Sequence, residues 1–519
     1  MKNLLTILVL VISVTACATQ SPAPVSPIPA SQGSQALATA TRPRESSVTQ
    51  TPQASGGRNQ VTRTPQDNRG GDATQNLSLD VPAHPIDIIL GRPTQRSITA
   101  SVLAYQDSEG YIEFGTQVGV HPNKTPMRSF AKGQPVEILI DALSPNTQYY
   151  YQVFYRAGNS GGFTLLEEKS FRTQRVPNST FTFDIQADSH LDSNSSLDVY
   201  ARTLANERAD QPDFLIDLGD TFMTGKYQPY TAALPQYLAQ RYYLSLIGRS
   251  SPLFLVLGNH DGEDAQRGTL SAANDIQVWS AKLRTQYFPN PMPNDFYTGN
   301  PTPDKNVGAL QDYYAWEWGD ALLIVLDPYW FTPPQRGTTD NWNRTLGDAQ
   351  YQWLKKTLET SHAKWKFVFI HQLVGGLDKD GRGGVEVAKY FEWGGYNLDG
   401  SYGFMAERPD WAMPIHQLLV QNKADIVFHG HDHLFVKQDL EGIVYQEVPQ
   451  PSAARFGATN SAKEYSYVNG DVLSSSGHLR VTVSPLNVKV EYVRAYLPKD
   501  ENAQRKNGQV DYTYIIPAH

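Results

Sequence analysis

The stretch FHGHDH, residues 428–433, carries three of the twelve histidines of a 519-residue chain. The run before it, ADIVF (424–428), is mostly apolar and β-prone, which predicts a buried strand. We expect the strand to end at Gly430, where the backbone can turn sharply. His431 and His433 then follow on a loop, two residues apart. Imidazoles crowded at the carboxyl end of a strand are good transition-metal ligands, although two surface histidines would give the same short pattern.

Four further apolar runs end in polar residues of the same kind. Residues 181–187 lead into Asp188-Ser189-His190, 213–218 into Gly219-Asp220, 252–257 into Gly258-Asn259-His260-Asp261, and 366–370 into His371. Open α/β sheets place their binding sites at the carboxyl ends of strands. A hydrophobic core does not require polar residues at the ends of its strands, which we call polar tips. The five blocks together therefore predict one shared site.

In this order the blocks resemble the calcineurin-like metallophosphoesterase family, whose pattern is Asp-x-His, Gly-Asp, Gly-Asn-His-Asp, a single His and Gly-His-x-His. The resemblance covers roughly residues 181–450. It implies an α/β (α+β) fold, with a metallophosphoesterase β-sandwich flanked by helices, and a metal-dependent phosphoric ester hydrolase. Apolar residues at helical spacing between the blocks agree with this strand–helix alternation, at 197–209, 230–247, 348–358 and 414–422.

The resemblance also implies two metal ions that share one carboxylate. The implied ligands are Asp188, His190, Asp220 and His433 for the first ion, and Asp220, Asn259, His371 and His431 for the second. Such a pair can activate a water for in-line attack on phosphorus and hold the phosphate oxygens. All seven residues carry oxygen or nitrogen donors, as this chemistry requires.

Two further residues have implied catalytic roles without being ligands. His260 would stabilise the transition state and protonate the leaving oxygen. Asp261 would orient His260 and keep it cationic. His429 receives no role, because it can equally support the ligands or be exposed.

The identity of the two metals stays open. Purple acid phosphatases use Gly-Asp-x-x-Tyr, and the tyrosinate of that block binds ferric iron. Here Met223 stands at the position of the tyrosine, with Phe222 beside it, and His190 takes over as ligand. A purple ferric centre is therefore not expected, whereas manganese, zinc or an iron-containing pair all suit the donor set.

The first residues indicate export and lipid attachment. A charged start precedes the apolar run 4–14, which is typical of a secretory signal and too short for a comfortable transmembrane helix. The segment VTAC (14–17) resembles the bacterial lipobox, whose cysteine is lipidated. Cys17 is the only cysteine, so no disulfide framework is expected. Because Ala18 rather than aspartate follows it, the resemblance favours the outer membrane or cell surface.

The rest of the chain divides by composition into a tether and two domains. Residues 1–17 are the predicted signal, and 18–76 are rich in Ser, Pro, Thr, Gln and Ala, which predicts a disordered tether. Short strands at 97–104, 110–114, 135–140, 145–153 and 169–173 predict a small all-β sandwich over 77–176. It resembles a fibronectin type III domain, with Tyr149 or Tyr151 as its tyrosine corner. Residues 177–519 form the predicted catalytic domain, closed by strands at 479–483, 488–492 and 512–516.

Charge and composition limit the partners. A net charge of −8 and an isoelectric point near 5.9 argue against nucleic-acid binding.

The favoured function is a lipid-anchored, extracytoplasmic phosphoesterase that prefers monoesters, because the two-domain layout resembles acid phosphatases. A phosphodiesterase or nucleotidase is the alternative if the aromatic-rich insertions 286–340 and 375–411 stack a base. A catalytically inactive surface binding protein is a further alternative, which the complete ligand set and His260 disfavour. The oligomeric state stays open.

Overall fold

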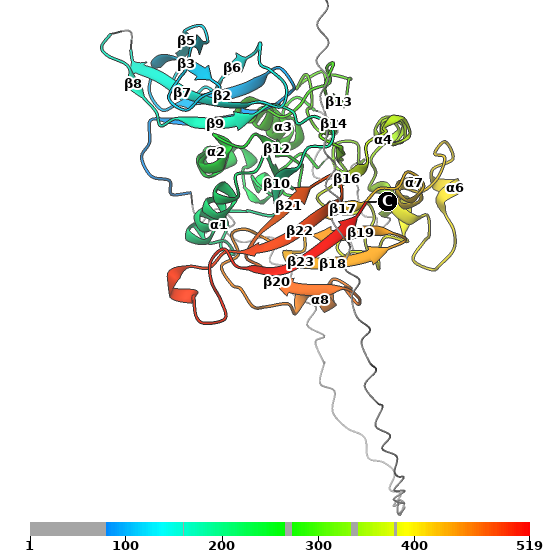
Figure 1. Ribbon diagram of the computed structural model, residues 1–519. Coiled ribbons are helices and arrows are strands. Elements are labelled where there is room, and N and C mark those ends of the chain that lie inside the picture. Colours follow the sequence, from blue (N-terminus) through cyan, green and yellow to red (C-terminus); the bar gives the residue numbers. More distant parts are fainter. Residues whose placement is uncertain (1–78, 159, 265–271, 334–340, 378–380, 519) are drawn as a thin grey trace, which may run out of the picture. The chain divides into compact units, whose positions relative to one another are not determined.

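The computed structural model describes residues 79–158, 160–264, 272–333, 341–377 and 381–518 (Figure 1). All of them belong to one compact unit, residues 68–519. The predicted signal, Cys17 and the predicted tether lie outside the described residues. In the part that is described, no helix combines the length and apolar character needed to cross a bilayer.

Two small antiparallel sheets lie between Ile86 and Arg172. One contains β1 (Ile86–Gly91), β2 (Ile98–Ala104) and β6 (Val136–Ile140). The other contains β3 (Ser108–Gly115), β4 (Asn123–Lys124), β5 (Arg128–Phe130), β7 (Gln148–Ala157), β8 (Thr164–Leu165) and β9 (Lys169–Arg172). Apolar side chains from both sheets share one core. The backbone N–H of Ser144 donates to the Tyr149 hydroxyl at 2.9 Å. The fibronectin type III similarity and its tyrosine corner stay predictions.

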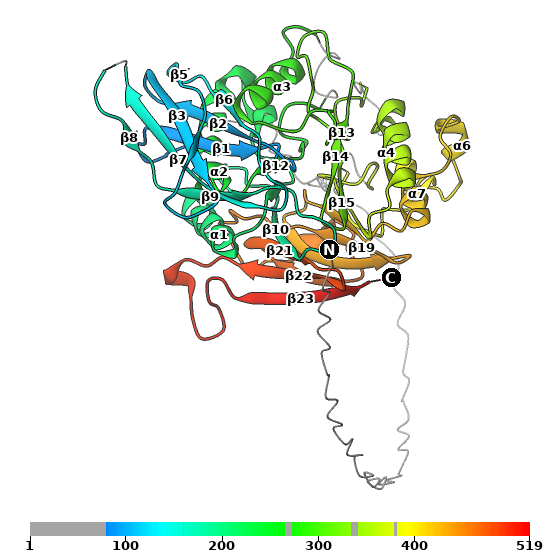
Figure 2. The same cartoon turned by 45° about the horizontal axis from the view of Figure 1, so that its top comes forward.

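The predicted catalytic region is built on two larger sheets whose apolar faces share a core (Figure 2). The six-stranded sheet runs, in spatial order, β12 (Leu253–Leu255), β11 (Leu215–Asp217), β10 (Phe181–Gln186), β21 (Gly477–Val483), β22 (Asn487–Arg494) and β23 (Val510–Pro517). The eight-stranded sheet runs β13 (Thr298–Gly299), β14 (Tyr314–Trp318), β15 (Ala321–Val325), β16 (Trp365–Phe369), β17 (Ile426–His429), β19 (Ile443–Glu447), β18 (Leu434–Leu440) and β20 (Asp471–Ser474).

Strand direction brings the polar tips together. Strands β10, β11 and β12 are mutually parallel, as are β15, β16, β17 and β19. Along β10, Phe183 and Ile185 enter the core while Asp184 and Gln186 face outward, as the two-residue strand period requires. The carboxyl ends of β10, β11 and β12 in one sheet and of β16 and β17 in the other carry the five predicted blocks.

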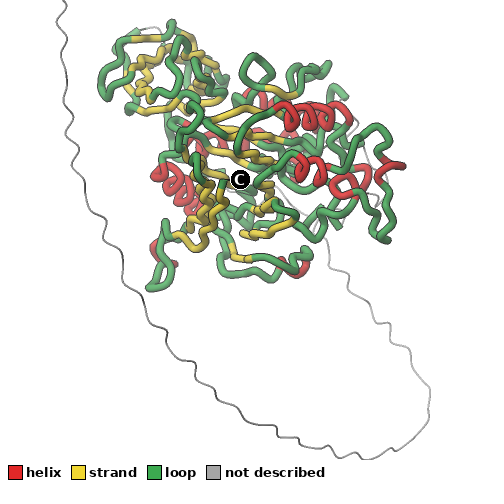
Figure 3. The backbone as a smooth tube through the Cα atoms, turned by 45° about the vertical axis from the view of Figure 1, so that its right-hand side comes forward, coloured by secondary structure: helices red, strands yellow, loops and turns green. Residues whose placement is uncertain are grey.

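Helices pack on the outer face of each large sheet (Figure 3), while the outward side chains of β23 are exposed. Side chains of α1 (Leu197–Asp210), α2 (Leu234–Gly248) and α3 (Ile276–Tyr287) pack on the six-stranded sheet. Those of α4 (Asp348–Thr360), α5 (Phe391–Gly394), α6 (Phe404–Glu407) and α7 (Ile415–Gln421) pack on the eight-stranded sheet, and α8 (Ser461–Glu464) precedes β20. This arrangement confirms the predicted β-sandwich flanked by helices.

The two aromatic-rich insertions, 286–340 and 375–411, bury several of their aromatic side chains. The range 286–340 contains β13, β14 and β15, so it contributes three strands to the eight-stranded sheet. Its Tyr297, Tyr329 and Trp330 are buried. In the second insertion, Trp393 is fully buried against the eight-stranded sheet. The sequence-based expectation overlooked the alternating run YAWEW, which together with the tight turn at Gly319 is typical of a hairpin.

Helix α2 connects the small sandwich to the catalytic region. Ile89 of β1 and Leu103 of β2 pack in the same apolar cluster as α2. The buried guanidinium of Arg241 donates to the carbonyl of Ser101 at 2.8 Å, and the Tyr151 hydroxyl donates to the carbonyl of Arg249 at 2.6 Å. The sandwich therefore holds the helix that, as shown below, supports one of the polar tips.

Candidate metal centre

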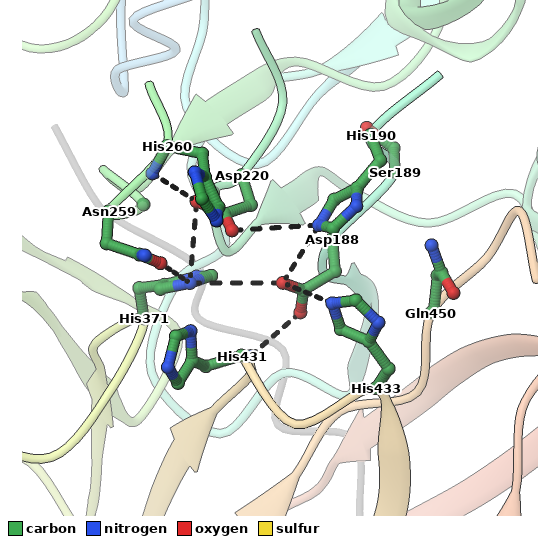
Figure 4. A network of polar contacts seen from close by, with 12 residues as sticks. Asp188, Ser189, His190, Asp220, Asn259, His260, His371, His431, His433 and Gln450 are labelled. Atoms are coloured by element: carbon green, nitrogen blue, oxygen red, sulfur yellow. Dashed lines mark hydrogen bonds and ion pairs between the residues drawn. The ribbon is translucent and has the colours of Figure 1, made fainter. Parts of the chain in front are cut away.

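The five predicted blocks meet between the carboxyl ends of the two sheets (Figure 4). Two groups of side chains each bring one donor atom per residue within 4.8 Å of the others. These groups are Asp188, His190 and His433, and Asp220, His371 and His431. They reproduce the division into two ions that the family resemblance implied, with Asn259 beside the second group.

The carboxylate of Asp220 faces both groups. Its Oδ2 lies 3.6 Å from His190 Nε2, and its Oδ1 lies 3.6 Å from His371 Nε2. On the first side, Asp188 Oδ1 lies 3.4 Å from His433 Nε2. On the second side, Asn259 Oδ1 lies 3.2 Å from His371 Nε2. The two oxygens of Asp220 are thus placed as a bridging ligand requires.

Several donor atoms in the centre are buried and lack a hydrogen-bond partner among the described residues. They include Asp188 Oδ1, His190 Nε2 and His431 Nε2. Buried polar atoms are nearly always paired in native proteins, so such a cluster points to cations as the missing partners. The mixture of carboxylate, amide and imidazole donors suits borderline metals such as manganese, zinc and iron. The residues therefore fit a dinuclear metal centre.

The backbone at the ligands is strained in a shared way. Asp188, His190, Asp220, His431 and His433 all have φ between 54° and 83°. Non-glycine residues adopt this left-handed region rarely, although Asp and His do so more often than most. Such conformations persist where the surroundings impose them, and they cluster at functional sites.

The sharp turn expected at Gly430 is made by its neighbour His431 instead. Gly430 has no positive φ, and its role is close approach. A Cβ atom there would lie 2.7 Å from Ala187 Cβ and 2.8 Å from Asp188 Oδ2. Only glycine lets β17 end so near the tip of β10, because any side chain would displace the ligand carboxylate.

Burial and charge act against each other at the carboxylates and at His190. Burial raises the pKa of Asp188, but the imidazoles of His371 and His433 outweigh it and hold the pKa well below its usual value. Burial likewise opposes charging of His190, yet neighbouring carboxylates, Asp188 first among them, raise its pKa to about 10. A metal ion must therefore displace a proton from His190, which makes metal binding weaker as the pH falls.

The second group contains imidazoles with a fixed orientation. His371 Nδ1 lies 2.8 Å from the carbonyl of Leu218, so that nitrogen carries the proton and Nε2 is left as the donor toward the centre. Burial is the main cause that lowers the pKa of His431 well below its usual value, and Arg382 and His371 lower it further. His431 is therefore neutral and has a lone pair to offer a metal.

Sequence reasoning missed the residues that hold the ligands in place. Asp192 Oδ2 lies 3.3 Å from His190 Nδ1 and 2.8 Å from Lys226 Nζ. From α2, Gln236 donates to the carbonyl of His190, and Gln240 donates to Ser189 Oγ at 2.9 Å. For Asp192 the only signal was its nearness to His190 in sequence, since ligand histidines usually donate their second ring N–H to a carboxylate, a carbonyl or water. The glutamines had none, because only the packing of α2 brings them here.

The surroundings of His429 and Met223 are also clear. His429 is buried, and its Nδ1 lies 2.7 Å from Glu447 Oε2, so it supports the strand end rather than facing solvent. Met223, at the position of the purple-enzyme tyrosine, is buried, and Phe222 stacks on Tyr237 with ring centroids 4.2 Å apart. The block after Asp220 thus offers no phenol to a metal.

Asp261 makes contacts that differ from its implied role as the partner of His260. Its Oδ1 accepts from the backbone N–H groups of Thr221 and Phe222, each at 2.8 Å. Its Oδ2 accepts from those of Gly258 at 2.8 Å and Asp220 at 3.1 Å. Four backbone donors therefore converge on one buried carboxylate, which ties the Gly-Asp block to the Gly-Asn-His-Asp block. Asp261 is a positioning residue for the bridging ligand.

Comparisons with known proteins agree with this geometry. The family model described as calcineurin-like phosphoesterase matches residues 181–435. "Probable purple acid phosphatase 20" of Arabidopsis thaliana is 22% identical over 345 residues, which are 66% of this chain and 64% of that protein. The chain's match thus spans just under two thirds of this curated relative.

Two solved structures share the fold. The structure of PhoD has a TM-score of 0.58 at 16% identity and covers 85% of this chain and 91% of its own. The purple acid phosphatase PPD1 from yellow lupin (Lupinus luteus) seeds has a TM-score of 0.55 at 17% identity and covers 83% of this chain and 74% of its own. At these identities the likeness establishes the architecture.

The contacts of Asp261 lead to a prediction for Asp261→Asn. An amide NH₂ would face two backbone N–H donors, so we expect a loss of about 1–3 kcal/mol of stability for each contact left unsatisfied. Asp220 would shift with its backbone, and metal content should fall. Thermal unfolding and metal per chain measure both effects.

The exposed Asp295→Asn is the matched control, and it should leave both quantities unchanged. If Asp261→Asn keeps full metal content and stability but changes the pH profile of turnover, Asp261 acts through His260 and the positioning role is refuted.

Proposed function

We propose that the chain hydrolyses small phosphate monoesters outside the cytoplasm and that a lipid on Cys17 anchors it to a membrane. The proposal starts from residues 181–435, which form a metal-dependent phosphoesterase domain of the calcineurin-like family. One observation carries the hydrolytic activity: two groups of buried donors share the carboxylate of Asp220. The preference for monoesters rests on the likeness to proteins named as purple acid phosphatases.

Two metal ions bound at this centre supply Lewis acidity toward the phosphoryl group and lower the pKa of a water. The chain's own residues set the geometry around them. The backbone N–H of His260 donates to Asp220 Oδ1 at 2.7 Å, which places this histidine directly beside the bridging carboxylate (Figure 4). The ring of His260 is half-buried, so it can give a proton to the leaving oxygen.

Access to the centre is on the His433 side. The side chain of His433 is 34% exposed, whereas those of Asp188, Asp220 and His371 are 0–2% exposed. A phosphate group can therefore approach from the edge formed by His433 and the half-buried His260. The carboxylates stay screened from water, which strengthens their hold on cations.

Two alternatives to a monoester phosphatase can be compared with the described site. A phosphodiesterase or nucleotidase was expected to stack a base on aromatic residues of 286–340 or 375–411. In the first range Tyr297, Tyr329 and Trp330 are buried, whereas Tyr396 and Tyr402 of the second range are exposed. An inactive binding protein would have no need of seven converging donors. Hydrolysis of small phosphate esters is the function that the described site supports best.

The direct test uses the full chain, purified in detergent without chelator. We expect about two or more metal ions per chain, and faster hydrolysis of a nitrophenyl phosphate monoester than of the corresponding diester. Metal analysis and initial rates on both substrates decide the matter. A higher kcat/KM for the diester would replace the monoester proposal, and metal-loaded protein without turnover on either substrate would support the binding-protein alternative.

The roles of two residues can be separated by mutation. His260→Ala should keep the metals and lose about 10²–10⁴-fold in kcat, the usual loss for a general acid. Asp220→Asn should lose catalytic metal and activity together, because it removes the bridging charge. The exposed His362→Ala is the control, with wild-type values expected. Unchanged turnover in His260→Ala would remove this residue from the mechanism.

The anchor is tested by Cys17→Ser. Without the thiol no lipid can be attached, so the protein should leave the membrane fraction while its kcat/KM stays at the wild-type value. Ser21→Ala in the predicted tether is the control and should stay with the membrane. Fractionation and the intact mass of the protein report the outcome; a Cys17→Ser protein that still sediments with membranes would refute the lipobox interpretation.

A further inference from the structure

Five ionisable side chains gather on the outer face of the six-stranded sheet, beneath α1, away from the catalytic centre. They are Asp184 of β10, His478 and Arg480 of β21, and Glu207 and Asp210 of α1. We call this group the α1 cluster. Asp184 pairs in register with Arg480, and His478 lies two residues further along on the same face. Glu207 and Asp210 are three residues apart and share one face of the helix.

Three of these side chains form a third group with metal-ligand spacing. One donor atom each of Asp184, Asp210 and His478 lies within 4.8 Å of the other two. His478 Nε2 is 2.9 Å from Asp210 Oδ2 and 3.9 Å from Asp184 Oδ2. Arg480 Nη1 contacts the other oxygen of Asp210 at 2.7 Å, so it does not occupy the space between the three donors.

Two carboxylates of the α1 cluster have no partner that the described residues supply. Asp184 and Glu207 are both 0% exposed, and neither oxygen of either side chain has a hydrogen-bond partner in the described part of the chain. Burying an unpaired carboxylate is strongly unfavourable, because the charged group loses its hydration and gains no partner. Something must therefore balance these groups.

Charge indicates what that partner is. Glu207 acts electrostatically on Asp184, so it belongs to the same charged environment. Arg480 pairs with Asp210 and acts electrostatically on Asp184, and it is the only guanidinium or ammonium group of the α1 cluster. It also contacts Glu491 at 3.0 Å, and Lys489 in turn pairs with Glu491. When ionised, the α1 cluster lacks two positive charges, the charge of one divalent cation. The negative charge can also be removed by protonating the carboxylates, and burial does raise the pKa of Asp184 and of Glu207.

We propose that the α1 cluster binds one divalent cation of the manganese or zinc type through Asp184, Asp210 and His478. Two carboxylates and one imidazole form a donor set that such ions accept. Asp184 precedes the ligand Asp188 by four residues, about 13 Å of extended strand, so the ion is separate from the catalytic pair. It joins α1 to β10 and β21, and its role is to stabilise the support of the catalytic centre.

The test measures metal rather than activity, so its result does not depend on the proposed function. Full-length protein is loaded with Mn²⁺, dialysed against metal-free buffer and analysed for metal per chain. We expect Asp184→Asn and His478→Gln each to lose one ion relative to wild type. Their kcat should stay within about twofold, and the rise in Tm that Mn²⁺ gives the wild type should become smaller. His416→Gln, at a buried histidine bonded to Tyr445, is the control and should keep the wild-type metal count.

A wild-type metal count in both variants would overturn the proposal and would mean that the buried carboxylates are protonated instead. This conclusion would be clearest if Asp184→Asn were also at least as stable as the wild type. If the variants fail to fold, crystals of the wild-type protein soaked in Mn²⁺ decide. An anomalous peak between Asp184 and His478 is expected, and peaks at the catalytic centre alone would refute the site.

Discussion

Placing Asp188 and Asp220 side by side away from water is unfavourable, because each carboxylate loses hydration and repels the other. The catalytic domain is arranged to make that pair possible. Imidazoles from both sheets surround the carboxylates and hold the pKa of each well below its usual value, in spite of burial. Cations at the centre complete the same balance. The fold thus concentrates negative charge in one small volume and supplies the positive charge from strand ends that are distant in sequence.

This arrangement depends on backbone positions that a few residues enforce. Gly430 allows β17 to end against the tip of β10, and Asp261 collects four backbone N–H groups that fix Asp220. Five of the candidate ligands have left-handed backbone conformations, and such conformations persist where the surrounding structure imposes them. The site therefore combines rigid strands with loops whose backbone is held in place. A small displacement of a strand end or of a loop would separate the donor atoms.

Support also reaches the centre from outside the two large sheets. Helix α2 packs on the small sandwich with one face and donates from Gln236 and Gln240 to the His190 loop with the other. On the same outer face, α1 covers the cluster around Asp184, whose partner we infer to be a divalent cation. Both helices thus act on β10, the strand that leads into the first ligands. The small sandwich is therefore linked through α2 to the loop that carries His190.

The sequence alone indicated the fold class, which the structure confirms, and predicted which side chains would gather as candidate ligands. Both follow from polar residues at the ends of apolar runs, a pattern that is local in the chain and that a hydrophobic core does not require. The sequence also indicated the strand and helix ranges near these polar tips. It did not predict that Tyr297, Tyr329 and Trp330 are buried, since a hydrophobic side chain in a long segment can serve a core or a pocket equally well. The contacts of Asp261, Gln236 and Gln240 were likewise decided only by tertiary structure. These side chains bind backbone groups brought close by packing, and no local pattern in the chain records which distant segment will lie beside them.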